Sequence, residues 1–198
     1  FLPDKELAQA SAMATAAKMA GVKHVIWSTL EDTRLKVPLK DKRMPTLMER
    51  YKVPHFDAKG ESDTAFRMAG LPTTYLRTSF YWENFIYFGL GPKRQPDGSL
   101  ALTLAMGDKK LPGIAAEDIG RCAYGIFRKG MDTIGQTIGI AGEHLTGAQM
   151  AAALTRALGQ EIRYDAVTPE EYRGYDNAAA KDVANMFQYM SEFESEFC

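Results

Sequence analysis

Ser28, His55 and Lys59 are the side chains whose types and spacing could do chemistry. Ser28 ends a predicted strand over 23–28, and His55 and Lys59 lie four residues apart at the start of a predicted helix, on one helical face. If the hydroxyl and the ammonium face one cleft, the ammonium can bind ribose hydroxyls or lower the pKa of a nearby acid. A solvated lysine and an ordinary turn serine explain the same pattern more simply, and the spacing alone leaves both interpretations open.

The segment 79–85, with the sequence SFYWENF, has the most unusual local composition. Aromatic residues dominate it, broken by one acid and one amide, directly after a predicted strand. Such a segment can wall a flat ring and offer an amide for hydrogen bonding. It can equally form a small satellite core under the loop that follows, and the residues do not separate these two interpretations.

The stretch 34–52 is basic, with seven lysines and arginines against Asp41 and Glu49. A basic lid would attract a phosphorylated ligand, but a solvated loop is the simpler interpretation.

Cys122 lies in an apolar helical pattern and is expected to be a buried small residue. The three histidines are scattered, and no G-x-G-x-x-G, phosphate-binding loop, C-x-x-C, H-E-x-x-H or G-x-S-x-G pattern occurs. We therefore expect no metal site.

The elements that would position these residues alternate between helix and strand. Four predicted helices each end at a glycine and lead into a strand. The helices span 4–20, 56–69, 116–129 and 146–158, and the strands that follow them span 23–28, 73–78, 136–140 and 161–164. A further helix begins at Thr168, and a last helix spans 178–190. One or two strands lie between 100 and 115. This alternation predicts an α/β fold with a parallel sheet. Long connections at 30–54 and 81–99 leave the strand ends where ligands bind in such sheets.

Composition narrows the function classes. The 198 residues contain 24 lysines and arginines against 25 aspartates and glutamates, which gives no electrostatic footprint for nucleic acid or for a membrane surface. No apolar run approaches the length of a membrane helix. The chain has two cysteines, Cys122 and Cys198, which suits a reducing compartment, so we expect a cytoplasmic protein.

Several segments together resemble the NmrA-like family, atypical members of the short-chain dehydrogenase/reductase superfamily. They are AGVKHVIWSTLE at 20–31, VPHFDAKGE at 53–61, residues 79–85, GDKK at 107–110, AEDIG at 116–120, 146–153 and ANMF at 184–187. The resemblance implies a partial Rossmann-type parallel sheet with helices on its faces and a small C-terminal α/β lobe. The core would comprise about 1–90 and 116–142, and the lobe about 91–115 and 143–198.

The resemblance also implies a cofactor, NADP or NAD, and roles for particular residues. Lys59 falls where the family lysine contacts the nicotinamide ribose and is the expected catalytic residue. Tyr81, Trp82, Glu83 and Asn84 fall on the segment against the nicotinamide, and Ser28 falls near the superfamily serine. The expected function is NAD(P)H-dependent reduction of a small carbonyl or quinone. The alternative is a redox-sensing regulator that binds NADP(H) and signals through a protein partner.

Two departures from the family pattern matter. His55 stands where the superfamily has its catalytic tyrosine, four residues before the lysine. The glycine-rich turn that grips the pyrophosphate is absent, and the sequence starts at a helix that precedes a later strand of the expected sheet. We therefore expect a fragment shortened at both ends that binds the cofactor weakly or not at all.

Overall fold

The computed structural model describes residues 1–197, which form two compact units. Unit 1 comprises Phe1–Thr78 and Glu117–Ile140, and unit 2 comprises Ser79–Ala116 and the chain from Ala141 onward. The domain limits at about residues 90, 116 and 142 that the sequence suggested stay a prediction.

Unit 1 is built on a parallel sheet, as predicted. β1 (Val25–Thr29), β2 (Thr73–Arg77) and β7 (Thr137–Gly139) lie in the order β1-β2-β7, with Val25 opposite Thr73 and Tyr75 opposite Thr137. The connections are helical, as parallel strands require: α2 (Pro54–Met68) joins β1 to β2, and α4 (Ala116–Lys129) with η2 (Gly130–Thr133) precedes β7.

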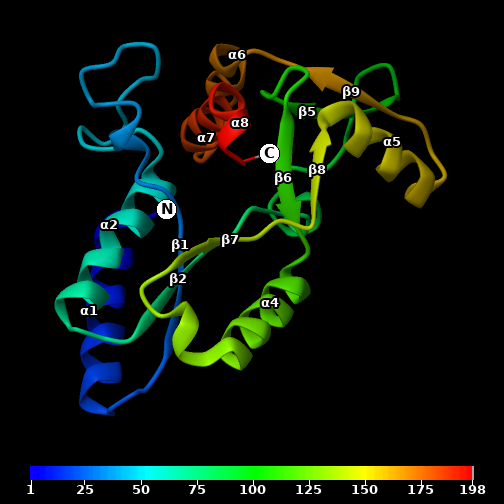
Figure 1. Ribbon diagram of the computed structural model, residues 1–198. Coiled ribbons are helices and arrows are strands. Elements are labelled where there is room, and N and C mark those ends of the chain that lie inside the picture. Colours follow the sequence, from blue (N-terminus) through cyan, green and yellow to red (C-terminus); the bar gives the residue numbers. More distant parts are fainter. Residues whose placement is uncertain (198) are drawn as a thin grey trace. The chain divides into compact units, whose positions relative to one another are not determined.

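One face of this sheet is covered by α1 (Pro3–Met19) and α2 (Figure 1). Trp27 and Tyr75 point to that face, where they form a core with Ala10, Ala14 and Phe66. The rings of Trp27 and Phe66 stack with their centres 4.4 Å apart. The two alanines have small side chains, so α1 packs closely against α2 and the tryptophan.

The other face is covered by α4. Side chains alternate along a strand, so Thr74 points away from Tyr75. Its Oγ1 donates to the carbonyl oxygen of Thr133 at 2.9 Å and lies 2.9 Å from Nε2 of His24. The ring of His24 meets Phe127 of α4 edge-on at 5.1 Å. Helices thus lie on both faces of the sheet, as the sequence predicted.

Unit 2 contains two three-stranded sheets, in the orders β3-β6-β8 and β4-β5-β9. Each sheet mixes one parallel and one antiparallel pair. The strands are β3 (Phe80–Tyr81), β4 (Lys93–Arg94), β5 (Leu100–Leu104), β6 (Lys110–Ile114), β8 (Glu143–Thr146) and β9 (Ile162–Ala166). The helices are α3 (Asn84–Tyr87), α5 (Gly147–Leu158), α6 (Pro169–Arg173), α7 (Ala180–Glu192) and α8 (Glu194–Phe197).

Local sequence signals account for many of the boundaries. Thr146 and Thr168 each accept a hydrogen bond from the backbone N–H three residues on, and Gln149 and Glu171 return a side-chain contact to the cap. Gly21 after α1 and Gly159 after α5 both have a φ of +66°, a conformation that costs glycine little. Cys122 is half-buried rather than buried as expected, and Ile126 is the residue of α4 that is buried.

No helix within residues 1–197 is both long enough and apolar enough to cross a membrane.

Candidate functional site

Lys59, the expected catalytic residue, lies on α2 in unit 1. Its Nζ is 2.7 Å from Oε1 of Glu6 on α1 and 5.3 Å from the centre of the Trp27 ring. The lysine side chain is 28% exposed and the glutamate side chain 21%. The ammonium therefore lies between a carboxylate and an aromatic face, and part of the lysine side chain stays exposed.

Further charges continue along the same face of α2. Asp63 and Arg67 follow Lys59 at four-residue steps, and Nη2 of Arg67 is 3.0 Å from Oδ2 of Asp63. The Arg67 guanidinium lies 4.8 Å from the centre of the Tyr75 ring. Asp63 is 5% exposed, and this burial raises the pKa of its carboxyl. Cations and a carboxylate thus alternate above the two aromatic rings of the sheet.

Ser28 lies half-buried in β1, between Trp27 and Thr29. Because side chains alternate along the strand, it points to the sheet face opposite the one that α2 covers. Thr29 is the neighbour that reaches α2, and its Oγ1 donates to the carbonyl oxygen of Lys59 at 3.2 Å. The structure thus brings Thr29, rather than Ser28, to the lysine. The cofactor role of Ser28 stays a prediction.

His55 lies in the first turn of α2, one turn before Lys59. Its ring meets that of Phe56 edge-on, with centres 4.9 Å apart, and that of Phe1 at 6.2 Å. The position that the resemblance assigns to a catalytic tyrosine is therefore occupied by an imidazole packed against aromatic rings.

Asp57 ties together the two ends of the segment between β1 and α2. Its Oδ1 accepts hydrogen bonds from the backbone N–H and the hydroxyl of Thr33, at 2.8 and 2.6 Å. Its Oδ2 accepts from the backbone N–H groups of Lys52 and Val53, at 2.7 and 3.1 Å. The carboxylate is fully buried. The side chain of Asp57 therefore joins the two ends of segment 33–53 through hydrogen bonds.

Lys40, Lys42, Arg43 and Arg50 of this segment are exposed, as in a solvated loop, whereas Lys52 is buried within unit 1. Lys52 is 1% exposed, its Nζ donates to the carbonyl oxygens of Asp41 and Met44 at 2.6 Å each, and burial lowers its pKa. The other contacts are ion pairs of Arg34 with Asp32 and Glu61, of Arg43 with Asp41, and of Arg50 with Glu61.

Tyr81, Trp82, Glu83 and Asn84 all belong to unit 2, at β3 and the start of α3. Trp82 donates its backbone N–H to the carbonyl oxygen of Ile114 at 3.0 Å, and its ring covers Gly113 so closely that a Cβ there would lie 2.1 Å from a ring carbon. Both carboxylate oxygens of Glu83 lie 3.0 Å from the backbone nitrogen of Ala116, the first residue of α4. Trp82 and Glu83 therefore have structural contacts of their own, and their cofactor contacts stay predictions.

Tyr81 and Asn84 are half-buried. The Asn84 backbone oxygen accepts from the N–H groups of Phe88 and Leu90, at 3.3 Å each, which closes the short helix α3. Just before this segment, the Oγ of Ser79 is buried without a hydrogen-bond partner among residues 1–197. A buried polar atom without a partner marks a place that a ligand or water would complete.

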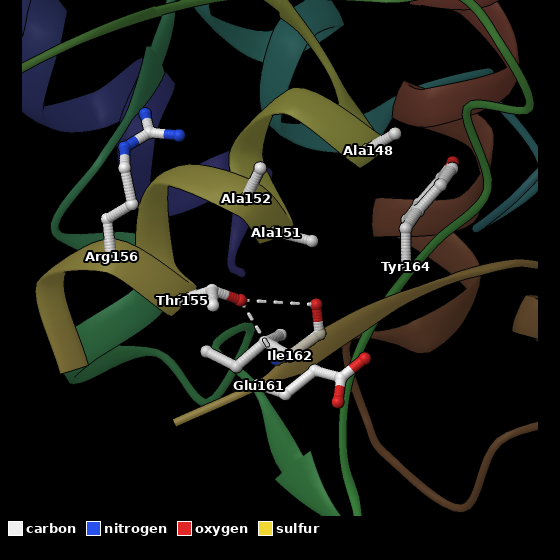
Figure 2. A pocket seen from close by; sticks show the side chains of 8 residues that line it. All are labelled: Ala148, Ala151, Ala152, Thr155, Arg156, Glu161, Ile162 and Tyr164. Carbon is white, nitrogen blue, oxygen red and sulfur yellow. Dashed lines mark hydrogen bonds between the residues drawn. The ribbon is translucent and has the colours of Figure 1, made fainter. Parts of the chain in front are cut away.

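A shallow hollow lies elsewhere in unit 2, between α5 and β9 (Figure 2). Its helix side is formed by alanines and Thr155, whose Oγ1 accepts from the backbone N–H of Ile162 at 2.9 Å. Tyr164 closes one end and donates its hydroxyl to the carbonyl oxygen of Gly107 at 2.9 Å. None of the sequence-predicted site residues lines this hollow. Within residues 1–197, no group of three or more histidine, cysteine or acidic side chains is placed to hold a metal.

The sequence reasoning missed Glu6, Thr29 and Asp57. A signal for Glu6 exists: it precedes Ala10 and Ala14 at four-residue steps, so it lies on the stripe of α1 that faces the core. Asp57 gives no comparable signal, because an acid in the first turn of a helix is common for electrostatic reasons alone.

Known proteins resemble this chain along most of its length. It is 31% identical over 160 residues to the nitrogen metabolite repression protein nmr of Neurospora crassa, covering 77% of this chain and 31% of that protein. It is 27% identical over 173 residues to the NAD(P)H azoreductase of Xenophilus azovorans, covering 86% of this chain and 53% of that protein. The crystal structure of NmrA, a negative transcriptional regulator, in complex with NADP has a TM-score of 0.73 at 26% identity, over 95% of this chain and 57% of that chain.

The chain spans between 31% and 61% of the length of these and two further curated relatives. A triphenylmethane reductase from Citrobacter, at 18% identity and a TM-score of 0.67, shares the fold. Residues 2–196 match the NmrA-like family, and the chain belongs to that family.

Proposed function

We propose that the protein containing this chain binds NADP or NAD and uses NAD(P)H to reduce a small carbonyl or quinone. The observation that carries the proposal is the likeness, over 95% of the chain, to NmrA structures solved with NAD and with NADP. The similarity to an NAD(P)H azoreductase supports the reductase reading.

The chemistry of Lys59 suits the ribose of such a cofactor. An ammonium carries three N–H donors, and a single contact to Glu6 leaves others for ribose hydroxyl oxygens, which accept hydrogen bonds. The bound cofactor would supply the hydride. Lys59 would hold the ribose and organise proton delivery to the substrate, through the ribose or a water molecule.

The segment Tyr81–Asn84 suits the nicotinamide half by its chemistry. Aromatic faces accommodate a flat ring, and the Asn84 amide can hydrogen-bond a carboxamide. The neighbouring Ser79 hydroxyl, buried without a partner in the described chain, supports a polar ligand beside this segment. Ser28 is the remaining candidate contact of the cofactor.

A non-catalytic, redox-sensing regulator that signals through a protein partner is the second candidate. Two observations favour it. His55 occupies the tyrosine position and is packed against aromatic rings, which weakens tyrosine-type proton transfer. The N. crassa repression protein and NmrA are both named as regulators.

Titration of the whole protein with NADPH and NADH tests the binding proposal. We expect Lys59→Ala to weaken binding by at least about tenfold, because charge-assisted hydrogen bonds to the ribose are lost. Lys129→Ala, which removes an exposed lysine from the last turn of α4, is the matched control and should bind as the wild type does. Unchanged affinity in Lys59→Ala would remove Lys59 from the site.

Consumption of NADPH with a panel of quinones and aldehydes separates the two candidates. Sustained turnover with any of them identifies a reductase and contradicts a pure sensor. Tight cofactor binding without turnover, together with capture of a partner that depends on NADP(H), identifies a regulator.

A further inference from the structure

Glu6 occupies an unusual place for a charged residue. It stands on the core-facing stripe of α1, one turn before Ala10 and two turns before Ala14, which are 0% and 2% exposed. Lys59 faces it from α2, and the two helices pack closely along their length. Both side chains are mostly covered, at 28% exposed for Lys59 and 21% for Glu6, and replacing an ion pair in such a place by apolar residues is often neutral or stabilising.

The pair is held from three directions. The Trp27 ring lies under the ammonium at 5.3 Å, and this ring is itself fixed by stacking on Phe66. Thr29 fixes the backbone of Lys59 through its carbonyl oxygen. Glu6 then contributes a charged contact, at 2.7 Å, that sets the direction of the flexible lysine side chain.

We propose that Glu6 is a positioning residue for Lys59. Its carboxylate holds the ammonium above Trp27 and leaves the remaining N–H donors directed at a ligand, so that Lys59 is preorganised for ribose hydroxyls. This inference rests on the proposed function, since it assigns Glu6 a role in the same cofactor contact.

Lysine Nζ NMR signals test the pairing without any cofactor. The signal of Lys59 is assigned by its loss in Lys59→Met. We expect Glu6→Gln to shift it, and Asp4→Asn to leave it in place. Asp4 is the control because it lies in the same helical turn with a side chain that is 90% exposed. A Lys59 signal that is the same in Glu6→Gln and in the wild type overturns the inference.

A double-mutant cycle on the dissociation constant for NADPH tests the role. We expect Glu6→Gln to weaken binding by about tenfold or more, as misplacement of a contact group does. In the Lys59→Met background the same change should have no further effect, because Glu6 acts only through the lysine. The melting temperature of Glu6→Leu/Lys59→Met should stay close to that of the wild type, which shows that the fold does not require the pair.

The outcomes separate the two proposals. Wild-type affinity in Glu6→Gln, with Lys59→Met still impaired, overturns the positioning role and leaves the proposed function intact. Equal weakening by Glu6→Gln in both backgrounds also overturns it, because Glu6 would then act elsewhere. A wild-type protein that does not bind NADPH or NADH overturns the proposed function and the positioning role with it.

Discussion

Asp57 shows how much one buried carboxylate can organise. It receives hydrogen bonds from Thr33 at the start of segment 33–53 and from Lys52 and Val53 at its end. Within the segment, Lys52 is buried on backbone carbonyl oxygens, so its charge holds the chain's path rather than facing a ligand. The segment therefore packs as part of unit 1, and its conformation depends on the hydrogen bonds by which Asp57 joins its two ends.

We expect Asp57→Asn to lower the free energy of unfolding by about 2–3 kcal/mol, because the amide NH₂ would face N–H donors and leave buried groups unsatisfied. Urea denaturation measures the change. Asp97→Asn is the matched control: it removes the same charge from a side chain that is 63% exposed, and the change should stay within about 0.5 kcal/mol. If Asp57→Asn lowers the free energy of unfolding no more than Asp97→Asn does, the Asp57 carboxylate does not hold the two ends of segment 33–53 together.

The sequence indicated Lys59 but not its surroundings, for a physical reason. Local spacing reveals pairs three or four residues apart, such as Asp63 and Arg67. Glu6 and Lys59 are 53 residues apart, so their contact depends on how α1 and α2 pack. For the same reason the predicted cofactor roles of Ser28 and of Tyr81–Asn84 need a ligand-bound measurement to be tested.

Elements were predictable where their signals are local. The two capping boxes and the glycines after the long helices put most helix ends within one or two residues of their observed positions. The strand β8 was not predicted. The two-residue strands β3 and β4 were also missed, because two residues show no periodicity. They form only because β6 and β5 are present to pair with them.

The contact between Gly113 of β6 and Trp82, which lies between β3 and α3, gives a prediction at this scale. Gly113 has no room for a side chain under the Trp82 ring, so Gly113→Ala should destabilise the protein by about 1–3 kcal/mol and change the near-ultraviolet circular dichroism of the tryptophan. Gly139→Ala on β7 is the control, because a Cβ there meets nothing within 4 Å. Adding Trp82→Leu should recover part of the stability of Gly113→Ala. A Gly113→Ala protein as stable as Gly139→Ala would contradict this packing.

At the scale of the whole molecule, the chain alternates between the two units. It leaves unit 1 after Thr78, returns at Glu117 and leaves again after Ile140. Each unit has its own sheet or sheets, and the core of Trp27, Phe66 and Tyr75 lies wholly in unit 1. The sequence suggested a core and a lobe, but where the chain crosses depends on contacts distant in sequence.

If each unit is one cooperative element, a local defect should loosen that unit alone. In native-state hydrogen exchange, Asp57→Asn should speed exchange in 1–78 and 117–140 and leave 79–116 and the part from 141 onward unchanged. Gly113→Ala should do the reverse, which makes each variant the control for the other. The reason is that each substitution breaks contacts inside one unit, at Thr33 and Val53 in the first case and at Trp82 in the second. Uniform acceleration across both units in either variant would show that they unfold together as one.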